Sequence, residues 1–219
     1  MGHHARASRA KGSPRWIRWV VNNAPELLNQ QIGVGRINWR SPIASDNYDE
    51  YRGDAFLNRL GVTLPLRSLE SFWPRGGPRW DALGRAESGE IVLVVAKAHV
   101  NELYSPATPA SESSLPLIQV SLRETALGLG VPDGFDWSKQ FYQYANRLAH
   151  AYLLNVINGI PLRLALVYFI GDPDVGGPSE RTEWESAIAT VHCAIGLPEV
   201  PRFVVDVFID VSEHLQMIW

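Results

Sequence analysis

The sequence predicts an α/β fold, a three-layer sandwich with a mixed central β-sheet flanked by helices. Two apolar runs, 91–96 and 164–170, have the length of strands and lack polar alternation. Such runs are typical of strands that are covered on both faces. Helical segments separate the runs, and the predicted order is helix, two paired strands, two helices, strand, helix, strand.

The helices are placed by their periodicity and by the residues that begin or end them. Gly61 ends the first, Pro74 follows the second, and Gly159 with Pro161 closes the longest. Thr182 and Glu185 have the spacing of a capping box. The predicted helices are 46 or 49 to 60, 66–72, 113 or 114 to 129, 139–158 and 182–195.

The strands begin with a hairpin. Residues 80–85 and 91–99 are predicted to pair around a turn at Glu87-Ser88-Gly89. Two further strands are predicted at 162–170 and 202–211. Within a single domain of 219 residues, a core is therefore expected over 65–211, with the chain before about Ser45 wrapping over it.

Basic residues gather at the N-terminus although the net charge is −3. Residues 1–25 hold five Arg and Lys residues and no acid: Arg6, Arg9, Lys11, Arg15 and Arg18. We expect residues 1–20 to form a flexible basic arm, which either binds phosphates or carries its charge incidentally.

Cellular location is suggested by what the composition lacks. Cys193 is the single cysteine, which excludes an internal disulfide framework and suits a reducing cytoplasm. No apolar run approaches the roughly 20 residues that span a bilayer, and the N-terminus has no apolar signal region. We expect a cytoplasmic protein with no membrane partner.

Asp81 and Lys97 are the candidate chemical centre. Asp81 begins one strand of the hairpin and Lys97 ends the other, so the two share one edge of the sheet. Val95, Lys97 and His99 point to the same face, because side chains alternate along a strand. An aspartate binds a hard cation such as Mg²⁺, and a lysine beside it orients water and stabilises negative charge. This combination favours phosphodiester cleavage.

Arg79-Trp80-Asp81, the hairpin and Val95-Ala96-Lys97 resemble the D…(D/E)-x-K signature of the PD-(D/E)XK nuclease superfamily. The resemblance covers residues 65–170 best and implies a restriction-endonuclease-like fold that hydrolyses DNA with Mg²⁺ or Mn²⁺. It implies that Asp81 and the carbonyl of Ala96 bind the metal and that Lys97 assists catalysis. Glu70 is the candidate for an additional acid on a preceding helix.

Val95 departs from the signature, because it stands where the superfamily has its second acid. A valine cannot bind a metal. Three explanations remain open: an acid such as Glu70 or Glu102 replaces it, the chain binds without cutting, or an active parent has been substituted.

The helix after the hairpin carries a polar stripe of Gln143, Asn146, Arg147 and His150. These side chains suit phosphate and water, so we expect Gln143 at the catalytic centre and Asn146, Arg147 and His99 along the substrate. Phe141, Tyr144, Leu148 and Tyr152 are predicted on the opposite, apolar side.

Two functions compete, with a structural alternative beside them. The first is a metal-dependent nuclease, and the second is a noncatalytic nucleic-acid- or protein-binding module on a degenerate nuclease fold. In the structural alternative Asp81 caps a turn, and Lys97 extends its ammonium group to water from a strand end.

Overall fold

The computed structural model describes residues 10–217, and these build one mixed sheet with the strand order β1-β2-β3-β4-β5. The β1–β2 and β2–β3 pairs are antiparallel, and the β3–β4 and β4–β5 pairs are parallel. The mixed central sheet is confirmed. Its strands are β1 (Ile37–Ser41), β2 (Ala82–Ala86), β3 (Ile91–Lys97), β4 (Leu162–Ile170) and β5 (Val204–Asp210).

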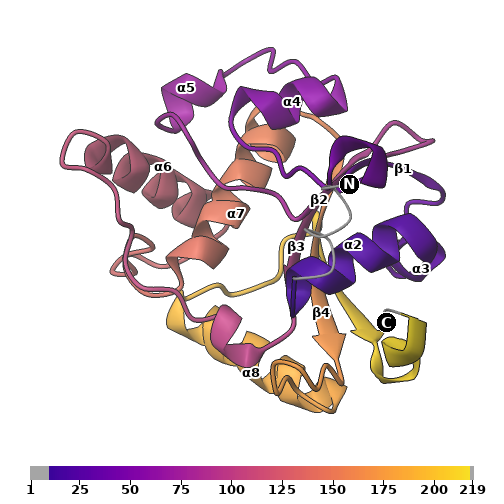
Figure 1. Cartoon of the computed structure of the whole chain (residues 1–219). Helices are drawn as coiled ribbons and strands as arrows, with labels where there is room; N and C mark the ends of the chain where they lie inside the picture. The colour runs from indigo at the N-terminus through magenta and orange to yellow at the C-terminus, as the bar shows by residue number, and fades with distance from the viewer. Residues whose placement is uncertain (1–9, 218–219) are drawn as a thin grey trace.

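Helices cover both faces of the sheet, which confirms the three-layer arrangement. Alternation along β3 sends Leu93 and Val95 into one apolar cluster, and Val92 and Val94 into the other. Figure 1 shows α6 and α7 on one side of the strands and α2 and α3 on the other. The first face carries α4 (Asp54–Leu60), α5 (Leu69–Phe72), α6 (Leu115–Gly128), α7 (Tyr142–Tyr152) and α8 (Arg181–Ala194), and the second carries α2 (Ser13–Asn23) and α3 (Glu26–Ile32).

Several predicted elements are shorter than expected. The helix predicted from 46 or 49 begins only at Asp54, because Asn47 and Tyr48 have φ angles of 49° and 59° after the short turn η1 (Ala44–Asp46). The helix predicted over 139–158 becomes α7 and a π-helical turn, η3 (Leu153–Ile157). None of the helices within residues 10–217 is long and apolar enough to cross a membrane.

The N-terminal arm is the main correction to the predicted fold. Residues 13–20 are not flexible but lie in α2, which buries Trp16, Ile17, Val20 and Val21 against the sheet. The expected core of 65–211 is therefore too short, since α2, α3, β1 and α4 belong to the same packed unit. Residues 1–9 of the predicted arm lie outside the described part of the chain.

Polar contacts fix α2 in place. The indole N–H of Trp16 donates to Asp172 Oδ2 over 2.7 Å, and Arg15 forms ion pairs with Asp172 and Asp174. Arg15 is thus committed to an internal contact rather than to a free basic arm. The hydroxyl of Ser13 donates to Glu102 Oε2 over 2.8 Å, which connects α2 to the end of β3.

Candidate functional site

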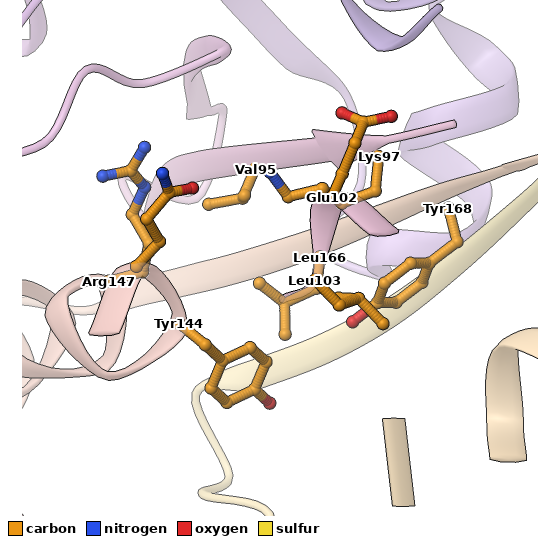
Figure 2. A pocket seen from close by; sticks show the side chains of 9 residues that line it. Val95, Lys97, Glu102, Leu103, Tyr144, Arg147, Leu166 and Tyr168 are labelled. Carbon is orange, nitrogen blue, oxygen red and sulfur yellow. The ribbon is translucent and has the colours of Figure 1, made fainter. Parts of the chain in front are cut away.

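The carboxyl ends of β3 and β4 border a small pocket, which we call the edge pocket. Open α/β sheets commonly bind ligands at this edge. The cavity has a volume of about 20 Å³, room for a single water-sized molecule. Figure 2 shows side chains from the strands, from α7 and from the turn η2 (Val100–Glu102) around it. Its lining consists of Val95, Lys97, Glu102, Leu103, Gln143, Tyr144, Arg147, Leu166 and Tyr168.

Asp81 lies just before β2, at the place where the β2–β3 ladder ends. Its N–H donates to the Val94 carbonyl over 3.1 Å, and its Oδ2 accepts the N–H of Ala96 over 2.9 Å. Continuing the register from the Ala82–Val94 pair places Asp81 opposite Val95. The Asp81 carboxylate thus accepts a hydrogen bond from β3, as a backbone carbonyl of a neighbouring strand would, and it lies at the edge of the sheet.

Burial and neighbouring charges act in opposite directions on the pKa of Asp81. Burial raises the pKa of Asp81, and the positive charge of Arg147, the hydrogen bond from Ala96 and the charge of Lys97 offset this only in part. Burial lowers the pKa of Lys97, and Asp81 is the largest influence that opposes this. The sequence prediction that Asp81 and Lys97 share one edge is confirmed.

Val95 fills the position of the second acid with an apolar side chain. It is 7% exposed and lines the edge pocket. Within residues 10–217, no group of three His, Cys, Asp or Glu side chains is placed to hold a metal ion. A divalent cation at this site would therefore be coordinated by fewer carboxylates than the superfamily signature implies.

Arg147 and Gln143 project from α7 into the lining, as the polar stripe predicts. The Arg147 guanidinium lies 5.2 Å from the centre of the Trp80 ring. Burial lowers the pKa of Arg147, and the negative charge of Asp81 is the largest opposing influence. An arginine beside an aspartate gives the pocket a cationic group that can meet phosphate oxygens.

The rest of the predicted stripe turns away from the edge pocket. Asn146 is buried and does not line it. His150 is fully buried against the rings of Trp73 and Trp80. Tyr144, predicted on the apolar side, lines the pocket instead and shares a 2.6 Å hydrogen bond with His192. The physical reason is that other elements cover α7 on several sides, so its polar residues do not share one solvent-exposed face.

Glu70 and His99 are also placed elsewhere. Glu70 is exposed on α5 and lines a separate cavity. His99 accepts the N–H of Asn101 at the start of η2, and its side chain borders an open groove near Ser13. A capping histidine is held by its own turn, so the alternation that aligned it with Lys97 ends there.

Glu102 does reach the edge pocket, but its carboxylate is already engaged. Its Oε1 accepts the N–H groups of Ala98 and His99 over 2.9 and 3.0 Å, and its Oε2 accepts the Ser13 hydroxyl. The bond from the His99 N–H is one half of the capping box of η2, and together the three bonds hold the chain after β3. Glu102 therefore has a structural task in addition to its place in the lining.

Glu50 is the acid that sequence reasoning missed. Burial and then the charge of Asp81 raise its pKa, against the influence of Arg18, Arg79 and Arg147. An isolated bridge brings it there, because the N–H of Trp80 donates to the Tyr51 carbonyl over 3.1 Å. Two carboxylates, Glu50 and Asp81, thus interact electrostatically at the sheet edge. No local periodicity marks Glu50, since its pairing with β2 is nonlocal.

Comparisons with protein-family models, with curated proteins and with solved structures found no match to this chain.

Proposed function

We propose that the edge pocket belongs to a metal-dependent phosphodiesterase site that acts on DNA, built on a restriction-endonuclease-like fold. The observation that carries the proposal is that Asp81 lies close enough to Lys97 and Arg147, two residues of the edge pocket, for their charges to act on its pKa, while the charge of Asp81 in turn raises the pKa of Glu50. Acids and cations that lie close together beside a partly apolar pocket suit a phosphate that carries charge and a water that must lose a proton.

Glu50 and Asp81 would hold the cation. Mg²⁺ is commonly bound by one or two carboxylates and completes its shell with water and substrate phosphate, so two acids are sufficient in number. Asp81 Oδ2 is hydrogen-bonded to Ala96, and Asp81 Oδ1 and the Ala96 carbonyl are the remaining oxygens next to Lys97. A bound Mg²⁺ or Mn²⁺ would supply a Lewis acid that lowers the pKa of water.

Lys97 and Arg147 would act on the substrate. Lys97 reaches the pocket from the end of β3, and its lowered pKa favours the exchange of a proton at Nζ with the attacking water. Arg147 and Gln143 would hold nonbridging phosphate oxygens. Val95, Leu166 and the tyrosine rings exclude bulk water, which strengthens these charges.

Val95 and Arg147 favour a second candidate function, the binding of nucleic-acid phosphate without metal or cleavage. Val95 offers no ligand, and Arg147 already places a positive charge beside Asp81 where a cation would act. In this case Lys97 and Arg147 bind the phosphate, and Asp81 positions Arg147 and closes the β3 ladder.

One experiment separates the two. The wild type, Val95→Glu and Lys97→Met are incubated with linear, circular and single-stranded DNA in Mg²⁺, Mn²⁺ or EDTA, and both cleavage and retention are measured. The first candidate predicts metal-dependent cleavage that rises in Val95→Glu and disappears in Lys97→Met. Lys139→Met removes an exposed lysine away from the lining and serves as the matched control.

The second candidate predicts no cleavage by any variant, with DNA retention in EDTA that falls at higher salt and in Lys97→Met. Retention that is equal in Lys97→Met and Lys139→Met contradicts a phosphate site at the edge pocket. Absence of both cleavage and retention contradicts both candidates.

A further inference from the structure

Three exposed arginines lie on the segments that lead into the candidate site, and we call them the arginine row: Arg52, Arg75 and Arg79. Arg52 follows Tyr51 and Arg79 precedes Trp80, the two residues of the isolated bridge. Arg75 and Arg79 stand at the two ends of the loop 75–79, which leads from α5 toward β2. Two segments that are distant in the sequence thus bring three positive side chains to one part of the surface.

The bridge sets Arg52 opposite Arg79. In an antiparallel pair, the residue after one partner faces the residue before the other, so the Tyr51–Trp80 bridge places these two arginines across from each other. Like charges directly opposite each other are destabilising. An anion that contacts both guanidinium groups would remove this repulsion.

Contacts within the protein leave the charges of the arginine row without a partner. Among residues 10–217, no acid forms an ion pair with any of the three, whereas Arg59 and Arg67 each pair with an acid. Nη1 of Arg52 lies over the loop, 3.8 Å from the place that a Cβ of Gly76 would take. A glycine there has no side chain to cover the guanidinium, so the arginine stays open to a ligand.

The arginine row adjoins the acids of the proposed cation site. Arg79 lies two residues before Asp81, and its charge lowers the pKa of Glu50, which the charge of Asp81 raises. The edge pocket has room for a single water-sized molecule, so a phosphate has to lie outside it. An anionic chain bound along the arginine row would pass Glu50 and Asp81 with its phosphates on the open surface.

Exposed arginines suit the phosphates of a nucleic acid rather than its bases. The planar guanidinium meets two phosphate oxygens at once. Roughly half to two-thirds of protein–DNA hydrogen bonds go to phosphate and sugar, and these contacts position the strand without reading its sequence. A nucleic-acid backbone carries a charge at every nucleotide, so neighbouring cations can each meet one.

We propose that the arginine row binds neighbouring phosphates of DNA and guides the strand past Glu50 and Asp81 without reading its sequence. The inference rests on the proposed function for the identity of the polyanion. It makes the three arginines positioning residues, because they hold the substrate away from the reacting atoms.

The test compares two triple variants of the full chain that have equal net charge. Arg52→Gln/Arg75→Gln/Arg79→Gln removes the arginine row. The matched control removes three exposed arginines that lie elsewhere on the fold, Arg36→Gln/Arg123→Gln/Arg202→Gln. Labelled duplexes of twenty base pairs, in two unrelated sequences, are titrated in EDTA at several salt concentrations and followed by fluorescence anisotropy.

We expect removal of the arginine row to weaken binding of both duplexes at least tenfold at low salt, and the control to weaken it less than threefold. The slope of log K against log salt should become shallower by about 2–3, because each lost phosphate contact removes about 0.9. In Mg²⁺, removal of the row should raise KM for cleavage and leave kcat unchanged. If the triple variant does not fold, Arg79→Gln and Arg36→Gln replace the pair, with an expected slope change of about 0.9.

The results distinguish the arginine row from the proposed function. Equal weakening and equal salt slopes in the two variants overturn the row, because net charge alone then explains binding. A preference between the two duplexes, or competition by polyglutamate as strong as that by unlabelled duplex, also overturns it. Cleavage with the same KM in both variants overturns the row and leaves the proposed function. Binding that depends on the row, without cleavage in any metal, overturns hydrolysis and leaves the row.

Discussion

The substitution Val95→Glu tests the metal site through stability rather than activity. It places a carboxylate in the edge pocket opposite Asp81 in the register of the hairpin. Val95 is 7% exposed, and burying such a side chain contributes about 1.5–3 kcal/mol. The new acid loses that contribution and meets the charge of Asp81, while Lys97 and Arg147 offset part of the repulsion. We expect the free energy of unfolding in EDTA to fall by about 2–4 kcal/mol.

Mg²⁺ should reverse much of this loss if the carboxylates converge on one cation. Binding to the folded state alone adds about 2.7 kcal/mol when the metal is present at one hundred times its Kd. Urea denaturation of the wild type, Val95→Glu and Val95→Gln, each in EDTA and in Mg²⁺, measures this directly. The glutamine has the size of glutamate without the charge, so it should be destabilised and should show little recovery. An equal response of Val95→Glu and Val95→Gln to Mg²⁺ would refute the convergence.

Three further predictions concern the scaffold. Gly84→Ala should lower the unfolding free energy by about 1–3 kcal/mol in urea, because its Cβ would lie 2.4 Å from Ile37 Cγ2; an unchanged midpoint contradicts this. Burial lowers the pKa of His150 to about 3 in the folded protein, against 6.5 for the free side chain. The neutral ring therefore contributes fully to the free energy of unfolding above pH 6.5, and this contribution, about 5 kcal/mol in all, is lost as the pH falls toward 3. His150→Phe should therefore lose about 3 kcal/mol less than the wild type between pH 7 and pH 4, and parallel pH profiles would count against a buried neutral ring. Asp172→Ala should cost about 3 kcal/mol and speed hydrogen exchange across α2, because the Trp16 N–H loses its buried acceptor; unaltered exchange there would show that α2 docks without it.

The central elements could be predicted because their signals are local. The short apolar runs of β3 and β4, with their β-branched and aromatic residues, favour strands covered on both faces, and the turn between β2 and β3 fixes how that pair meets. From this pairing the shared edge of Asp81 and Lys97 follows without any knowledge of distant contacts.

The periphery could not be predicted, because its structure depends on contacts far away in the sequence. β1 pairs only with β2, a contact that is distant in the sequence. The helix α2 is an exception, because Trp16, Ile17, Val20 and Val21 have helical spacing and give a local signal that the prediction of a flexible arm overlooked. Glu50 comes within electrostatic range of Asp81 because its neighbour Tyr51 forms a nonlocal bridge with Trp80. Of the polar stripe predicted on α7, Gln143 and Arg147 line the edge pocket, whereas Asn146 and His150 are buried away from it.

The hydrogen bond from Ala96 to Asp81 affects which residues of such a site are lost first during evolution. Asp81 completes the β2–β3 ladder whether or not any metal is ever bound, so selection for folding alone is enough to retain it. Folding does not require an acid at position 95, because an apolar side chain fills this buried position at least as well as an acid does. A lineage that no longer needs the chemistry would lose the acid at 95 first and keep the aspartate long afterwards. The surviving aspartate in such a chain records the needs of the fold rather than a present activity.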